Sequence, residues 1–384
     1  MKRTKHASKK NEINSLVIPQ KEFNHISRDG AVRRALTRQS HFYFFHIYFA
    51  KYVKNITAPF QREIISITED DSVKNFYCCA FRGSGKSTII TTSYPLWAIL
   101  GRKQKKFVLL LSQTQGQAKQ HMMNIKNELE ENTLLRDDLG PFKEESDEWG
   151  SKSLVFSNTG ARITAASSEQ GIRGLRHREH RPDLIIGDDV ENMASAKTKE
   201  GREKTYEWLK GEVIPAGDTD TDLAIVGNLL HEDSLLMHLK RDIEEKRLSG
   251  MFKSYPLLDE NDEPLWKDKY PSKEEIQILE KTIGDNKTFR REFLLEIVPD
   301  DDQVLAPEDI HYYKNLPKES PRKVIIGIDL AISEKSSADC TAVVSALIYG
   351  HGKDAYTYIL PHPINKRMRD ILKHSKKFKH NIMC

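Results

Sequence analysis

Residues 80–88 read Ala-Phe-Arg-Gly-Ser-Gly-Lys-Ser-Thr, between an apolar run at 76–79 and a helix-like stretch at 89–100. A glycine-rich turn between a strand and a helix binds phosphate, because its backbone N–H groups and the helix dipole favour an anion. In this pattern Lys86 reaches the β- and γ-phosphates, and the Ser87 hydroxyl holds Mg²⁺. The stretch predicts a nucleoside-triphosphate site formed by Gly83, Ser84, Gly85, Lys86, Ser87 and Thr88.

The loop departs from the usual G-x-x-x-x-G-K-[ST] pattern, because Ala80 stands where the first glycine is expected. The pattern therefore begins at Gly83, and Arg82 is added to it. Arg82 is either an arginine finger acting in cis on the transferred phosphoryl group, or a partner in a salt bridge or a DNA-phosphate contact. A glycine turn that merely opens a helix is the structural alternative for the whole loop.

Composition indicates a large protein with two domains, because 384 residues exceed what one hydrophobic core usually serves. The net charge is only +4, yet basic residues concentrate at both ends, as suits DNA or a solvated tail. No apolar stretch approaches a membrane span, and the N-terminus lacks the apolar core of a secretory signal. Four cysteines form neither a disulfide framework nor a zinc pattern, so we expect a cytoplasmic protein without a membrane partner.

The chain divides into four expected segments. Residues 1–55 form a basic arm and an aromatic helix, and residues 56–245 alternate strand-like and helix-like runs. Residues 246–320 are rich in charge and proline and predict a subdomain and linker, whereas residues 321–384 begin a second, short α/β domain. The alternation predicts a mainly parallel sheet with flanking helices. Its strands are expected at 76–80, 107–112, 154–156, 162–165, 184–187 and 223–226.

Acidic residues follow the apolar strand at 184–187, where a nucleotide site needs a carboxylate to hold Mg²⁺ through its water shell. Asp188 is the predicted magnesium-linked residue. Either Asp189 or Glu191 is predicted to polarise the attacking water as general base. Most such ATPases have glutamate directly after the aspartate, so Asp189 at that position leaves the choice open; a turn or helix cap is the structural alternative.

Two further polar residues are candidates for this site. Asn228 follows the strand at 223–226, where it is predicted to sense the γ-phosphate and to couple hydrolysis to movement. A plain turn at Gly227 and Asn228 is the alternative. In Pro59-Phe60-Gln61 the Gln61 amide offers a donor and an acceptor to the edge of adenine.

Together these residues resemble the large terminase subunit of tailed bacteriophages, the ATP-driven motor that packages DNA and carries a nuclease. The resemblance runs from about residue 59 to residue 360 and implies a P-loop NTPase of ASCE type, with ATP and Mg²⁺ as cofactors. Its elements follow in the order of the family: Pro59-Phe-Gln61, Arg82–Ser87, Ser112-Gln-Thr-Gln115, Gly171-Ile-Arg-Gly174, Arg181–Glu191, Gly227-Asn228, Pro264-Leu-Trp266 and Phe289-Arg-Arg-Glu-Phe293.

The resemblance also implies an RNase H-like nuclease that cuts DNA with two Mg²⁺ or Mn²⁺ ions. The run 325–331 looks like its opening strand, with Asp329 as the first metal-binding carboxylate. After Asp339, however, only Asp354 and Asp370 remain, and neither follows an apolar strand. We therefore expect an incomplete RNase H-like α/β domain with weak or absent cleavage, as in a disrupted prophage gene or one half of a split gene.

The resemblance implies double-stranded DNA as substrate, a homo-oligomeric ring on a portal protein, and a small terminase subunit as partner. Two other functions remain open. A helicase-like ATPase would need a second RecA-like lobe, which residues 245–384 do not resemble. A non-catalytic DNA-binding prophage remnant would lack ATPase activity that depends on Lys86.

Overall fold

The computed structural model describes residues 28–143, 148–168, 170–297, 311–329, 341–351, 355–361 and 363–366. The chain forms two compact units, Met1–Val298 and Pro299–Cys384. Within the described part of the chain, no helix has both the length and the apolar character that crossing a membrane requires.

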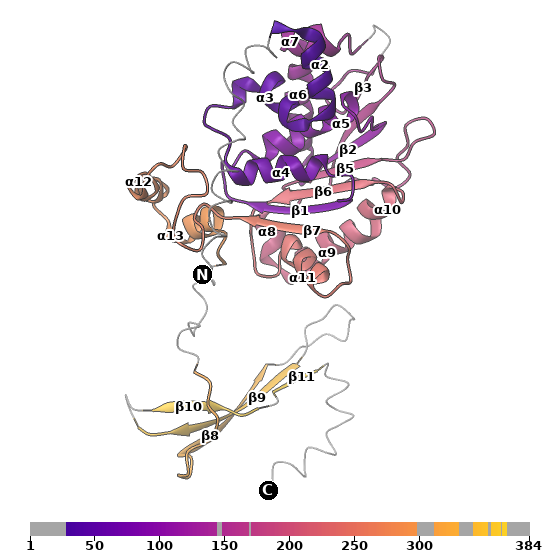
Figure 1. Ribbon diagram of the computed structural model, residues 1–384. Helices are drawn as coiled ribbons and strands as arrows, with labels where there is room; N and C mark the ends of the chain where they lie inside the picture. Colours follow the sequence, from indigo (N-terminus) through magenta and orange to yellow (C-terminus); the bar gives the residue numbers. More distant parts are fainter. Residues whose placement is uncertain are drawn as a thin grey trace, which may run out of the picture. The chain divides into compact units, whose positions relative to one another are not determined.

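A seven-stranded sheet forms the centre of the first unit, in the order β3-β4-β2-β5-β6-β1-β7 (Figure 1). Every neighbouring pair is parallel except β3 and β4. The mainly parallel α/β fold predicted from the alternating pattern is therefore confirmed. The strands are β1 Asn75–Ala80, β2 Phe107–Ser112, β3 Ser153–Val155, β4 Arg162–Ser167, β5 Leu184–Asp188, β6 Asp222–Gly227 and β7 Met251–Tyr255.

Strand order decides which loops meet at the edge of the sheet. Strand β6 lies between β1, which leads into the glycine-rich loop, and β5, which ends at Asp188. Cys79 of β1 pairs with Gly227 of β6, and Asp188 of β5 pairs with Val226. The carboxyl ends of three parallel strands therefore lie together, where open α/β sheets bind their ligands.

Helices cover both faces of the sheet (Figure 1). Successive side chains of a strand point to opposite faces, so Phe76, Cys78 and Ala80 enter one apolar core and Tyr77 and Cys79 enter the other. The helices toward the first core are α2 Gly30–Gln39, α3 His41–Tyr48, α4 Pro59–Glu69, η3 Thr88–Ser93, α5 Tyr94–Leu100, α6 Gln115–Glu131 and α7 Thr133–Leu139, and the short η2 Ala50–Tyr52 follows α3 without burying a residue. Those toward the second are α8 Met193–Lys197, α9 Lys199–Trp208, η4 Leu209–Val213, α10 Ile214–Ala216 and α11 Leu235–Glu244.

The chain after β6 remains part of the first unit. Strand β7 pairs with β1 at the edge of the sheet, and the backbone N–H of Phe81 donates to the carbonyl of Tyr255. The backbone N–H of Arg82 donates to the carbonyl of Glu292 over 2.8 Å, so the last turns of this unit contact the glycine-rich loop directly. These last elements are α12 Lys273–Ile283, α13 Asn286–Phe289 and η5 Arg290–Leu294.

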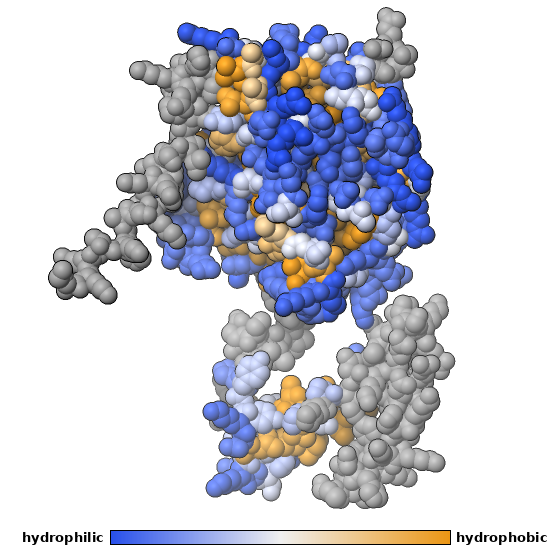
Figure 2. Space-filling view, turned by 45° about the vertical axis from the view of Figure 1, so that its right-hand side comes forward, coloured by the Kyte–Doolittle hydropathy of each residue, from blue (hydrophilic) through white to orange (hydrophobic). Residues whose placement is uncertain are grey.

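The described part of the second unit is an antiparallel sheet without a helix. Strand β9 (Thr341–Tyr349) is central and pairs with β8 (Lys323–Asp329), β10 (Tyr356–Ile359) and β11 (Ile364–Lys366). Asp329 is the last residue of β8, whereas Asp339 lies outside the described residues. Apolar side chains of β8 are exposed, with Val324 and Ile328 at 59% each, and Figure 2 shows such side chains gathered on this unit.

Candidate nucleotide-binding site

The glycine-rich loop turns sharply between β1 and η3. Gly83 and Gly85 have φ of +78° and +87°, and residues other than glycine rarely adopt this backbone conformation. A Cβ at Gly85 would also lie only 3.0 Å from Nε2 of Gln61. Ala80, in contrast, is a regular residue of β1 that pairs with Tyr255. The chain therefore needs no glycine at the position where the common pattern has its first one.

Two side chains hold the loop from outside. Nε2 of Gln61 donates to the Ser84 carbonyl over 2.6 Å, and Nζ of Lys269 donates to the Gly83 carbonyl over 2.7 Å. The oxygen of the Gln61 amide accepts from the backbone N–H of Ala58 over 3.0 Å. Both ends of the amide are thus engaged within the protein, so a contact with adenine would require one of these bonds to be exchanged.

Lys86 and Asn228 meet at the carboxyl ends of β1 and β6. Lys86 is only 7% exposed, and its ammonium donates to Oδ1 of Asn228 over 2.7 Å. The Asn228 amide donates in turn to Oε2 of Glu292 over 2.7 Å. The guanidinium of Arg82 is 70% exposed and lies 3.5 Å from the same carboxylate oxygen. The structure therefore brings Lys86, Asn228 and Arg82 together through Glu292.

Asp188 is a buried carboxylate with one unused oxygen. It is 1% exposed, and its Oδ2 accepts from the Thr91 hydroxyl over 2.7 Å, with Nε2 of His121 at 3.7 Å. Its Oδ1 has no hydrogen-bond partner among the described residues, although burying such an atom unpaired is costly.

This carboxylate suits Mg²⁺, which in nucleotide sites takes one or two carboxylates together with water and phosphate oxygens. Among the described residues no group of three or more His, Cys, Asp or Glu side chains offers a cage made by protein alone. Oδ1 of Asp188 and the hydroxyl of Ser87, which precedes η3, would supply two such ligands and leave the other positions to water and phosphate oxygens. The residues present therefore fit Mg²⁺ bound with a nucleotide.

Asp189 follows β5 in a strained conformation. Its φ is +46°, and its backbone N–H donates to the Val226 carbonyl over 3.0 Å. Its side chain reaches solvent, yet surrounding protein still raises the pKa of its carboxyl, and repulsion from Asp188 raises this pKa further. Lys86 acts in the opposite direction. Asp189 is thus electrostatically linked to both other charges of the candidate site.

Glu191 contacts a different element. Its Oε2 accepts from the backbone N–H of Leu235 over 2.9 Å, at the first residue of α11, where an acceptor stabilises a helix. Burial raises the pKa of Glu191 to about 7. Of the two residues predicted as general base, Asp189 therefore interacts with Lys86 and Asp188, whereas Glu191 caps α11.

Four residues that contact the loop or Asp188 were not predicted from the sequence as site residues: Thr91, His121, Lys269 and Glu292. The ammonium of Lys269 lies 5.0 Å and 5.3 Å from the ring centroids of Trp266 and Tyr270. No local pattern marks Lys269, and Glu292 lies in the motif at 289–293 without a predicted role, because the partners of both residues lie far away along the chain. Asp329 belongs to the second unit, and Thr88 opens η3.

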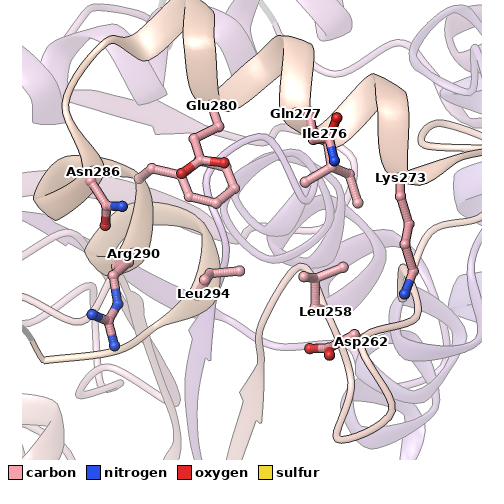
Figure 3. Close-up of a pocket in the computed structure, with 10 residues that line it drawn as sticks. Leu258, Asp262, Lys273, Ile276, Gln277, Glu280, Asn286, Arg290 and Leu294 are labelled. Carbon is pink, nitrogen blue, oxygen red and sulfur yellow. The ribbon is translucent and has the colours of Figure 1, made fainter.

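A separate cavity of about 470 Å³ lies among α12, α13, η5 and the turn at 258–262 (Figure 3). Apolar and charged side chains line it together, including Ile276, Glu280 and Arg290. None of the predicted site residues is among those that line it.

Comparison with known proteins gives matches among solved structures. No family profile and no curated protein matches the chain. The structure is similar to the HK97 bacteriophage large terminase, with 16% identity, a TM-score of 0.43, and coverage of 83% of this chain and 65% of that one. For the large terminase of a thermophilic bacteriophage in complex with ADP, identity is 12%, the TM-score is 0.41, and coverage is 85% and 74%.

A third similar structure is the ATPase domain of the Thermus phage P74-26 large terminase, with 14% identity and a TM-score of 0.39. The match covers 63% of this chain and 99% of that domain. The chain spans 65% of the length of the HK97 protein.

Proposed function

We propose that the first unit is an ATPase. The observation that carries the proposal is the buried ammonium of Lys86, which follows two glycines with positive φ and lies beside the polar end of β6. A buried lysine at this place is a pre-positioned counter-charge for phosphate oxygens. Gly83, Ser84, Gly85, Ser87 and Thr88 would supply the other phosphate contacts.

The remaining residues divide the work of hydrolysis. Ser87 and Asp188 would hold Mg²⁺, which neutralises charge on the phosphates. Asp189 accepts a proton from the attacking water, with Glu191 as the alternative base, while ADP leaves the γ-phosphorus. Asn228 responds to the γ-phosphate, and Arg82 stabilises the charge that develops on it. Gln61 contributes to adenine binding if its bond to the loop opens.

We further propose that hydrolysis moves double-stranded DNA, as in a phage large terminase. The order of the motifs from Gln61 to Glu292 supports this role. A portal protein, a small terminase subunit and a ring of identical subunits are the corresponding partners. The helicase alternative is less well supported, because the described part of the second unit is an antiparallel sheet and not a parallel RecA-like one.

The test of this function is ATP turnover by the purified protein with and without linear double-stranded DNA. We expect DNA to accelerate turnover, and the acceleration to fade as salt rises from about 50 to 200 mM, because DNA binding releases cations and added salt therefore weakens it steeply. DNA binding without any ATP turnover would instead support the non-catalytic remnant.

For the second unit we propose an RNase H-like nuclease site with Asp329 as its first metal-binding residue. Among the residues of the described strands Asp329 is the only carboxylate, whereas a two-metal site needs more than one. We expect little or no cleavage of plasmid DNA with Mn²⁺. Robust cleavage that disappears in Asp329→Ala would show that this expectation is wrong.

A further inference from the structure

Glu292 is a buried acidic residue that no predicted role accounts for. Its side chain is 9% exposed and lies on η5, more than sixty positions beyond Asn228, the residue after β6 that it contacts. Oε2 accepts from Nδ2 of Asn228 over 2.7 Å, and Oε1 lies 3.3 Å from Nε of Arg291. With the bond from Lys86 to Asn228, the side chains form a continuous series in the order Lys86, Asn228, Glu292 and Arg82.

The carboxylate decides which way the Asn228 amide faces. An ionised carboxylate only accepts hydrogen bonds, so it can only receive the NH₂ group of the amide. The carbonyl oxygen must then face the other way, toward the ammonium of Lys86, which only donates. A glutamine at position 292 would have nearly the same shape, yet it could donate or accept and would leave the amide free to turn over.

Glu292 also acts on the loop itself. Its carbonyl accepts from the backbone N–H of Arg82, and its carboxylate lies 3.5 Å from the Arg82 guanidinium. The phosphate groups of a nucleotide would compete with Asn228 for Lys86 and with Glu292 for Arg82. The same carboxylate therefore contacts Arg82 directly and Lys86 through Asn228, and these are the two cations that the proposed ATPase would use.

We infer that Glu292 is a positioning residue of the nucleotide site, which orients Asn228 toward Lys86 and holds Arg82 until phosphate displaces it. This inference rests on the proposed ATPase function. Under it, Glu292 of η5 fixes the orientation of Asn228, which follows β6, and of Arg82 in the glycine-rich loop.

The test is a double-mutant cycle in which the donor and the acceptor of the hydrogen bond between positions 228 and 292 change places. Asn228→Asp alone places two carboxylates face to face, so we expect a thermal midpoint lower by several degrees and nucleotide affinity weaker by about tenfold. Glu292→Gln alone is expected to lower kcat about tenfold while changing KM less than about threefold. In the double variant the new carboxylate at position 228 faces Lys86 and the new amide at position 292 donates to it, so the acceptor and donor match again.

We expect the double variant to recover most of the thermal midpoint, and at least about fivefold in kcat/KM, relative to Asn228→Asp. Glu296→Gln is the matched control, because Glu296 pairs with Arg290 on the same turn but is half-exposed. This control should behave like the unaltered protein.

Binding of a fluorescent ATP analogue and the thermal midpoint are measured for every variant. If the losses in the two single variants simply add, Glu292 does not orient Asn228 and the inference is wrong. If the unaltered protein neither binds nor hydrolyses ATP, the proposed function fails. The thermal cycle still decides whether Glu292 and Asn228 are linked as described.

Discussion

We expect Lys86→Ala to abolish ATP turnover, with a fall of at least about 100-fold, because it removes a pre-positioned charge opposite a reacting phosphate. The effect should be large because the ammonium is buried beside the Asn228 amide, so solvent screens it little. Lys86→Arg should not restore turnover, since a planar guanidinium cannot replace a compact ammonium in a space closed by Asn228. The measurement is phosphate release at saturating ATP, together with binding of a fluorescent analogue.

The control for this variant is Lys267→Ala, which removes an exposed lysine that pairs with Glu263. Turnover should stay within about twofold of the unaltered protein, because an exposed pair contributes little. The thermal midpoint of Lys86→Ala should remain close to that of the unaltered protein, since Asn228 keeps its bond to Glu292. A Lys86→Ala protein that folds and retains turnover would exclude this loop as the nucleotide site.

Asp189→Asn is expected to lower kcat by about 100-fold or more, the usual cost of losing a general base. Asn keeps the shape of Asp and tolerates the positive φ of this position, so the fold should be retained. The prediction rests on the link of Asp189 to Lys86 and Asp188, since surrounding protein and repulsion from Asp188 raise the pKa of its carboxyl and Lys86 lowers it. Single-turnover hydrolysis with excess protein separates this step from product release.

Glu191→Gln is the comparison for the alternative base, and its kcat should change by less than about threefold. Its stability, however, should respond to pH. The pKa of Glu191 is about 7 in the folded protein and 4.5 in its ordinary state, so the folded form binds this proton more tightly. The free energy of unfolding therefore falls as pH rises from about 4.5 to about 7, by on the order of 3 kcal/mol.

Glutamine does not titrate, so the variant avoids this loss of stability. Between pH 5 and pH 8, on either side of the pKa of about 7, its thermal midpoint should rise relative to that of the unaltered protein. Parallel midpoint curves for the two proteins would contradict the burial of a titrating Glu191. Loss of turnover in Glu191→Gln but not in Asp189→Asn would assign the base to Glu191.

Short sequence patterns predicted those parts of the molecule that depend on the conformation of neighbouring residues in the chain. The glycine loop could be predicted because Gly83 and Gly85 need positive φ within a strand-to-helix turn, and Asp188 and Asn228 because apolar strands precede them. The mainly parallel α/β fold is confirmed, whereas the roles of the site residues remain predictions.

Contacts between distant parts of the chain could not be predicted. Strand β7 reads Met-Phe-Lys-Ser-Tyr and lies half-buried at the edge of the sheet, so it lacks the continuous apolar pattern of β2 or β5. Lys269 reaches Gly83 across 186 positions, and Glu292 reaches Asn228 across 64. Gln61 was predicted as a site residue, but its hydrogen bond to the Ser84 carbonyl depends on how α4 packs against the loop.

The left-handed backbone at Asp189 bears on why aspartate follows Asp188 where glutamate is more common. Short Asp and Asn side chains adopt this conformation more readily than longer ones, since they hydrogen-bond locally. An aspartate is one methylene shorter, so its oxygens end about 1.5 Å nearer to the backbone. Whatever exchanges a proton with Asp189 must therefore approach the end of β5 more closely, and a glutamate here would gain reach only in a backbone conformation that it adopts less readily.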